Sequence, residues 1–168
     1  MIKFIVTGPE SSGKTTMCKA LSKHFQINHI EEYARKYLEN LNRNYNKDDL
    51  LKIAKHQKKL EKKNNKINIY DTDLITIKIW SLYKYKVCHE WILNEIENQK
   101  SENRFYILCK PDLPWEYDPL RENPNNRYDI YNLYIEELEN LDANYIICKG
   151  NNRTDQAILK ISKLISNI

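Results

Sequence analysis

The residues best suited to chemistry lie close to the start of the chain. Residues 8–15 read Gly-Pro-Glu-Ser-Ser-Gly-Lys-Thr, the G-x-x-x-x-G-K-T pattern of a phosphate-binding loop. In such a loop successive backbone N–H groups form a nest for phosphate oxygens, the lysine reaches the terminal phosphates and the threonine hydroxyl can ligate Mg²⁺. The pattern predicts that Lys14 and Thr15 bind a nucleoside triphosphate with its metal ion. The neighbouring residues expected around the phosphates are Gly8, Glu10, Ser11, Ser12, Gly13 and Thr16.

The alternative interpretation of this stretch is an ordinary turn that joins a strand to a helix. The chain has only three glycines, Gly8, Gly13 and Gly150, and two of them occupy the positions that the pattern requires. An apolar run at 2–7 precedes the loop, and apolar residues at helical spacing follow it over 14–24. Because a phosphate loop needs this strand–loop–helix context, nucleotide binding is the favoured interpretation.

Short apolar runs alternate with helical patterns along the whole chain. The predicted strands are 2–7, 27–30, 67–70, 105–109 and 145–148. The predicted helices are 14–24, 33–39, a long helix that Asp48 caps and that ends near Asn64 and Asn65, 74–85, 90–99, 129–141 and 154–165. This alternation predicts an α/β fold, in which helices cover both faces of a parallel sheet.

Acidic residues follow the second and third predicted strands, where ligands gather in an open parallel sheet. Asp71 is predicted to be the acidic partner of the phosphate loop, because a carboxylate there can hold Mg²⁺ beside Thr15 or accept a proton. Glu32 and Asp73 are further candidates for the base that accepts a proton from an attacking hydroxyl, and the sequence does not rank the three carboxylates. Capping of the next helix is the alternative for Asp73, and an ordinary surface position is the alternative for Glu32.

A segment rich in proline and asparagine, at about 111–128, lacks periodicity and predicts a lid. Arg121 and Arg127 are expected to neutralise charge on a transferred phosphoryl group, with two solvated arginines as the alternative. Trp115 stands among carboxylates and suits a flat, positively charged ring. Trp80, in an apolar helix, is expected in the core instead.

Composition excludes several classes of protein. The 168 residues fit one domain, 1–168, and no apolar run is long enough for a membrane span. The 27 basic residues are interleaved with 23 acidic ones, whereas nucleic-acid binding would need a segregated basic surface. No targeting segment precedes the first strand, so a cytoplasmic location is the default expectation. The four scattered cysteines predict buried apolar filler, and the sequence does not indicate an oligomeric state.

Six stretches occur in an order typical of one family of kinases. After the phosphate loop come E-Y-A-R at 32–35, I-A-K-H-Q at 53–57, D-T-D at 71–73, P-D-L-P-W-E-Y-D-P-L-R at 111–121 and G-N-N-R at 150–153. Over essentially its whole length the chain resembles the ribosylnicotinamide kinase domain of the bifunctional NAD-salvage and regulator proteins, a P-loop kinase of the nucleoside type. The resemblance implies ATP- and Mg²⁺-dependent phosphorylation of the 5′-hydroxyl of nicotinamide riboside, which gives nicotinamide mononucleotide. It also implies a three-layer P-loop fold with strand order 2-3-1-4-5 and a lid after the fourth strand.

The resemblance also implies roles for individual residues. Glu32 becomes a general-base candidate, and the stretch that ends at Arg153 is expected to border the adenine of ATP. The residues expected to bind the nucleoside are Glu32, Tyr33, Arg35, Asp73, Trp115 and Asp118. Because Met1 begins at the first kinase strand, neither an adenylyltransferase nor a DNA-binding domain is expected. The alternatives are a kinase for another nucleoside or nucleotide, and an ATP-binding switch or ATPase without a small-molecule acceptor.

Overall fold

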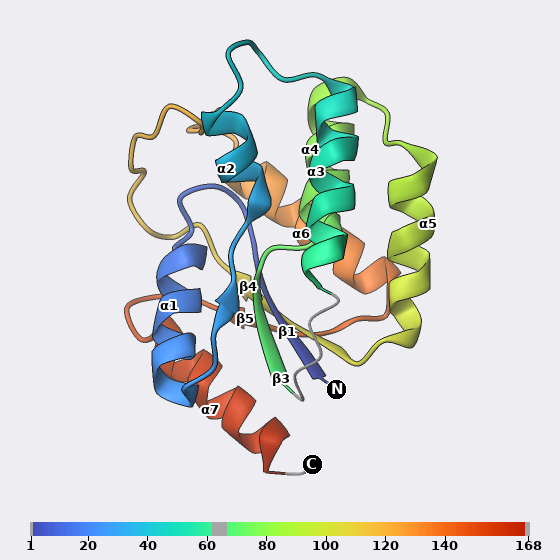
Figure 1. Cartoon of the computed structure of the whole chain (residues 1–168). Helices are drawn as coiled ribbons and strands as arrows, with labels where there is room; N and C mark the ends of the chain where they lie inside the picture. The colour runs from blue at the N-terminus through green and yellow to red at the C-terminus, as the bar shows by residue number, and fades with distance from the viewer. Residues whose placement is uncertain (1, 62–66, 167–168) are drawn as a thin grey trace.

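A parallel sheet lies at the centre of the computed structural model, which describes residues 2–61 and 67–166 (Figure 1). Its strands are β1 (Ile2–Thr7), β2 (His29–Ile30), β3 (Ile67–Asp71), β4 (Arg104–Cys109) and β5 (Asn144–Cys148). They are arranged as β2-β3-β1-β4-β5, so the predicted order and parallel pairing are confirmed. In the central strand Val6 lies opposite Asp71 on one side and Ile107 on the other.

Helices cover both faces of this sheet (Figure 1). They are α1 (Lys14–Phe25), α2 (Tyr33–Glu39), α3 (Lys47–Leu60), α4 (Leu74–Tyr85), α5 (Glu90–Asn98), α6 (Arg127–Asn140) and α7 (Arg153–Ile165), with a 3₁₀ turn at Gln99–Ser101. Successive strand residues point to opposite faces, so Phe4 and Val6 pack in a core with α1 and α7. Ile5 packs with α4 and α6 on the other face.

A third apolar cluster joins α2, α3, α4 and α5 beside the sheet. It fixes α2 and α4 relative to each other, and both helices then border the site described below. The loop between β4 and α6, drawn in yellow to orange, arches past α2 (Figure 1). We call residues 110–126 of this loop the lid. No helix in the described parts of the chain is long and apolar enough to cross a membrane.

Two helix starts differ by two residues from the sequence-based predictions. Helix α3 is capped by Asn46 and not by Asp48, because Asn46 and Asp49 exchange side-chain-to-backbone hydrogen bonds in a capping box. Its last residue is Leu60, and the predicted end at residues 64–65 lies outside the described residues. Helix α6 begins at Arg127 rather than at residue 129, so Arg127 belongs to the helix that follows the lid.

Candidate active site

The phosphate loop lies between the end of β1 and the start of α1. Gly8 and Gly13 adopt φ values of +136° and +83°, in the region that favours glycine. A Cβ atom on Gly8 would lie 2.6 Å from the carbonyl oxygen of Cys109, so a side chain has no room there. The Ser12 hydroxyl and the Lys14 ammonium group both donate to the Pro9 carbonyl, each at 2.8 Å. These contacts hold the loop in a tight curve in front of the N-terminus of α1.

Thr15 and Asp71 meet beside the loop, as their positions at the same edge of the sheet predict. The Thr15 hydroxyl donates to Asp71 Oδ2 at 2.8 Å. Asp71 is only 3% exposed, and its Oδ1 is buried without a hydrogen-bond partner in the described part of the chain. A hydroxyl and a carboxylate with one free buried oxygen suit Mg²⁺, which prefers oxygen ligands and uses few protein side chains when phosphates supply the rest. The residues present therefore fit the metal ion.

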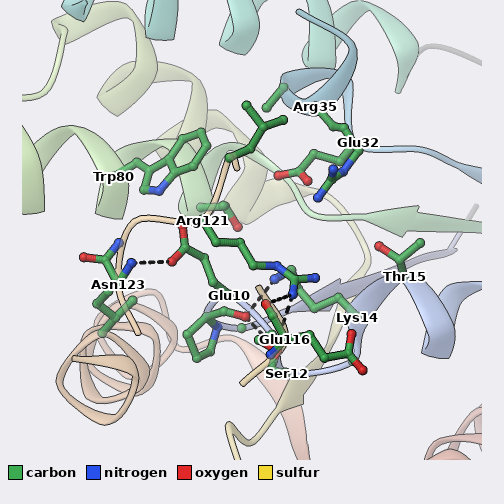
Figure 2. Close-up of a pocket in the computed structure, with 18 of the residues that line it drawn as sticks. Glu10, Ser12, Lys14, Thr15, Glu32, Arg35, Trp80, Glu116, Arg121 and Asn123 are labelled. Carbon is green, nitrogen blue, oxygen red and sulfur yellow. Dashed lines mark hydrogen bonds between the residues drawn. The ribbon is translucent and has the colours of Figure 1, made fainter. Parts of the chain in front are cut away.

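A cavity of about 280 Å³ extends from the phosphate loop to α2, α4, α6 and the lid. In Figure 2, Trp80 and Glu32 lie above the cavity, and the phosphate-loop residues Glu10, Ser12 and Lys14 lie below it. The apolar part of the lining outside the loop consists of Ala34, Leu38, Ile79, Trp80, Leu113, Pro114, Leu120 and Ile130. The polar part outside the loop consists of Glu32, Arg35, Thr76, Glu116, Arg121, Asn123 and Tyr134. One compartment thus combines phosphate-binding groups with an apolar, aromatic wall.

Glu32 carries the acidic group of the cavity wall opposite the loop. It directly precedes α2, and its carboxylate points into the cavity (Figure 2). Burial raises the pKa of Glu32 to about 7, and the charge of Asp71 adds to the rise, while the Lys14 ammonium group opposes it. A carboxyl with a pKa near neutrality can accept a proton at physiological pH and release it again.

Asp73 does not belong to the cavity, although it lies only two residues after Asp71. Its side chain is 0% exposed and accepts hydrogen bonds from the Tyr106 hydroxyl at 2.9 Å and from Arg104 at 3.2 Å. It also caps α4, by accepting from the backbone N–H of Ile75 at 3.0 Å. The predicted substrate-binding role of Asp73 is therefore wrong, and the alternative of helix capping is confirmed. The side chain turns into the core because Arg104, at the start of β4, needs acidic partners there.

The two tryptophans do not divide between cavity and core as predicted. Trp115 lies outside the cavity, with the guanidinium groups of Arg127 and Arg121 at 5.7 and 6.0 Å from its ring centroid. Trp80 packs against the third apolar cluster, as expected, and also lines the cavity. The carboxylates expected around a ring bound at Trp115 are also engaged elsewhere, because Asp112 pairs with Arg153 and Asp118 pairs with Arg35.

Two phosphate-loop residues between its glycines, Glu10 and Ser11, contact the lid. The Glu10 carboxylate accepts hydrogen bonds from the backbone N–H groups of Glu122 and Asn123, with the shortest contact at 2.9 Å (Figure 2). The Ser11 hydroxyl accepts from the backbone N–H of Glu116 at 2.9 Å. Glu10 and Ser11 were expected around the phosphates, yet in this structure their side chains hold the lid against the loop.

Arg121 in the lid and Arg127 at the start of α6 have different positions. Arg121 lines the cavity and points across it (Figure 2). Arg127 lies behind the loop, where its guanidinium donates to the backbone carbonyls of Ser11 at 3.1 Å and Leu113 at 3.0 Å. Arg121 is thus placed to meet a bound phosphate, whereas Arg127 braces the loop and the lid, contrary to its predicted contact with the transferred group.

Arg153 also supports the loop from behind. It is 7% exposed, and it donates to the carbonyls of Ser12 at 2.8 Å and Lys110 at 3.2 Å while it pairs with Asp112. These contacts occupy the guanidinium, so the predicted contact of Arg153 with ATP is replaced by a role in fixing the loop backbone.

The remaining predicted substrate residues lie around α2. Arg35 lines the cavity and forms an ion pair at 2.9 Å with Asp118, which joins α2 to the lid. Tyr33 turns away from the cavity and stacks on His56, with 3.6 Å between the ring centroids. The predicted contacts of Tyr33 and Asp118 with a nucleoside are therefore not supported by their positions.

Several lining residues were not predicted from the sequence. Thr76 and Tyr134 share a hydrogen bond of 3.2 Å, and both line the cavity with Trp80. They lie on α4 and α6, whose apolar periodicity indicates only that these faces are buried. A polar residue on an apolar helix face, such as Thr76, is the one signal that was available.

Comparisons with known proteins agree with this architecture. A family described as "AAA domain" matches residues 3–154, and no curated protein matches the sequence. NadR protein in complex with NR is 18% identical, with a TM-score of 0.67 over 96% of this chain and 50% of that chain. YorR protein from Bacillus subtilis, in complex with phosphorylated GDP, is 20% identical, with a TM-score of 0.67 over 98% and 95% of the two chains. Deoxyadenosine kinase from M. mycoides is 14% identical, with a TM-score of 0.67 over 96% and 99%.

These neighbours share the fold but differ in how much of their own chain this chain matches. The chain spans about half of the NadR chain and nearly all of the other two. The sheet order, the phosphate loop and the Thr15–Asp71 pair together define a P-loop kinase-like fold. Since the family match extends over most of its length, the chain belongs to the AAA domain family.

Proposed function

We propose that this protein is a kinase that transfers the γ-phosphoryl group of ATP to the 5′-hydroxyl of a nucleoside, with nicotinamide riboside as the acceptor. The observation that carries the proposal is the composition of the cavity, in which Lys14, the carboxyl of half-buried Glu32 and the ring of Trp80 line one compartment. A switch or an ATPase needs the phosphate loop but does not need an aromatic acceptor wall.

The donor side binds the triphosphate through the loop backbone and Lys14, with Arg121 placed to neutralise charge on the transferred group. Thr15 and Asp71 would hold Mg²⁺. When bound, this ion neutralises part of the phosphate charge.

On the acceptor side Glu32 takes the proton of the nucleoside hydroxyl, because its pKa of about 7 allows it to be ionised at neutral pH. The oxygen of that hydroxyl then forms a bond to the γ-phosphorus while the bond from that phosphorus to ADP breaks. Trp80 offers a flat face for the base of the nucleoside.

The choice of nicotinamide riboside rests on the motif resemblance and on the fold similarity to NadR in its complex with NR. A second candidate acceptor, another nucleoside, is favoured by the position of Trp115. The acidic surroundings that would suit a cationic ring there are neutralised by Arg153 and Arg35.

A panel of nucleosides tests the proposal. The protein is incubated with ATP and Mg²⁺ and with nicotinamide riboside, deoxyadenosine, other purine nucleosides or pyrimidine nucleosides. ADP release is measured by a coupled assay, and the monophosphate is identified by mass spectrometry. We expect the highest kcat/KM with nicotinamide riboside. A better purine or pyrimidine acceptor would correct the substrate and keep the kinase, whereas ADP release that no nucleoside stimulates would contradict the kinase and favour an ATPase or switch.

A further inference from the structure

The ring of Trp80 is supported from outside the cavity by another aromatic side chain. Tyr45, in the loop between α2 and α3, stacks on Trp80 with 5.8 Å between the ring centroids and an angle of 24°. Tyr85 holds Tyr45 in turn, because its hydroxyl donates to the Tyr45 carbonyl at 2.9 Å and the two rings meet edge-on. The plane of Trp80 is thus set by a residue that does not itself line the cavity.

The same tyrosine is connected to the lid through Glu122. The Tyr45 hydroxyl donates to one carboxylate oxygen of Glu122 at 2.7 Å, and the Lys84 ammonium group donates to the other at 2.8 Å. Lys84 also lies 3.8 Å from the centroid of the Tyr45 ring. The loop that carries Tyr45 and the helix that carries Lys84 therefore meet at one lid residue, although all three lie far apart in the sequence.

Glu122 also contacts the phosphate loop, through its backbone. Its N–H group donates to the Glu10 carboxylate at 3.1 Å, beside the similar bond from Asn123 (Figure 2). A continuous set of contacts thus runs from Trp80 through Tyr45 and Glu122 to Glu10.

A purely stabilising role explains this arrangement poorly. The side chains of Lys84 and Glu122 are 36% and 40% exposed, so solvent screens their ion pair and its contribution to stability is small. A small energy is sufficient, however, to fix the orientation of an aromatic ring and a lid residue, and binding depends strongly on such preorganisation.

We propose that Tyr45 and Glu122 are positioning residues for the acceptor nucleoside. They fix the ring of Trp80 and connect it to the part of the lid that Glu10 holds against the phosphate loop. The inference rests on the proposed kinase function, and it adds that acceptor binding and binding of the nucleotide at the loop favour each other through Glu122.

Steady-state kinetics of four variants test this inference, with the best acceptor from the nucleoside panel. Tyr45→Leu removes both the stack and the hydroxyl, and we expect the acceptor KM to rise about tenfold. Tyr45→Phe keeps the stack, so most of the affinity returns and the acceptor KM rises about threefold. Glu122→Gln is expected to raise it about threefold as well. In all three, kcat and the KM for ATP at low acceptor concentration, where the linkage does not contribute, stay within about twofold of wild type. Glu97→Gln on α5, which breaks an exposed ion pair with Lys100 in the following 3₁₀ turn, is the matched control and leaves every constant unchanged.

A binding measurement separates positioning from stability. Isothermal titration calorimetry gives the acceptor Kd with and without the ATP analogue AMP-PNP, and we expect the analogue to tighten acceptor binding in wild type and in Glu97→Gln. Glu122→Gln should lose most of this tightening, because linkage between the two ligands requires a contact that both affect.

Two outcomes overturn the inference alone. One is a change in the KM for ATP at low acceptor concentration as large as the change in the acceptor KM, and the other is a change in melting temperature with unchanged KM and unchanged linkage. In either case wild-type kinase activity keeps the proposed function intact. A wild type that phosphorylates no nucleoside overturns both proposals.

Discussion

The phosphate loop and the opposite wall of the cavity are constructed in different ways. The loop is one contiguous stretch, closed by contacts among its own residues such as those to the Pro9 carbonyl and braced from behind by Arg127 and Arg153. The opposite wall takes Glu32 from the start of α2, Trp80 from α4 and Arg121 from the lid. The loop therefore depends mainly on local backbone conformation, and the wall depends on how distant elements pack.

This difference indicates where specificity can change. The loop tolerates little variation, because Gly8 has no room for a side chain and Asp71 must meet Thr15. The wall is held by contacts between partly exposed side chains, such as Arg35 with Asp118. Substitutions there can change the acceptor while the donor site stays intact.

The largest expected effect is on the loop side. Lys14→Ala should lower kcat by about 10³-fold, because the charge that stabilises the transferred group is lost. The fold should remain, since the Lys14 side chain makes a single hydrogen bond to the Pro9 carbonyl. Coupled ADP release measures the rate and circular dichroism measures the melting temperature, with exposed Lys19→Ala on α1 as the control. Unchanged turnover would remove the loop from the mechanism.

Asp71 and Asp73 can be compared directly, because Asp71 contacts the phosphate loop and Asp73 is buried in the core. Asp71→Ala should lower kcat by about 10²-fold and change the free energy of unfolding by about 1 kcal/mol or less. Asp73→Ala should cost about 3 kcal/mol of that free energy, because Arg104 and Tyr106 lose a buried partner and α4 loses its cap. Urea denaturation and initial rates of the folded fraction measure the two effects. The reverse pattern would place Asp73 in the active site.

The pH dependence of kcat tests the role of Glu32 in the cavity wall. We expect kcat to rise as pH increases through about 7, because only the ionised carboxylate accepts the proton. Glu32→Gln should lower kcat by about 10²-fold and remove this dependence. Exposed Glu31→Gln is the control and should keep the wild-type profile.

The raised pKa of Glu32 also predicts how the stability of the protein depends on pH. Since burial raises the pKa of Glu32 from 4.5 to about 7, its stabilising contribution is present below pH 4.5 and is lost as pH rises through about 7. Glu32→Gln should therefore melt at a higher temperature than wild type at pH 8, and the gap should narrow as pH falls and close below pH 4.5. A gap that is independent of pH would contradict the raised pKa.

The smallest effects are expected for substitutions of the two tryptophans. Trp80→Leu should raise the nucleoside KM about tenfold, because a base loses its stacking surface. Trp115→Leu should leave that KM within about twofold and lower kcat instead, because Arg121 and Arg127 lose the ring they pack on. Melting temperatures of both variants control for packing losses. A raised nucleoside KM in Trp115→Leu alone would return the acceptor to the position expected from the sequence.

The sequence by itself determined the sheet and the donor site. The parallel sheet, the phosphate loop and the pairing of Thr15 with Asp71 follow from local patterns, because parallel strands that end at one edge bring the residues after them together. The strand order was implied by the family resemblance. Such patterns report backbone conformation and burial, and both are encoded over a few neighbouring residues.

Only the tertiary structure decided the partners of the other side chains. Asp73 turned to Arg104, Trp115 packed against the lid arginines, and Arg153 bound the loop backbone from 141 residues away. Each choice depends on where a distant segment runs, as with Glu10 and the lid N–H groups more than a hundred residues later. A tryptophan or a carboxylate has the same local pattern in a core, in a lid or in a cavity, and the packing of distant elements selects among them.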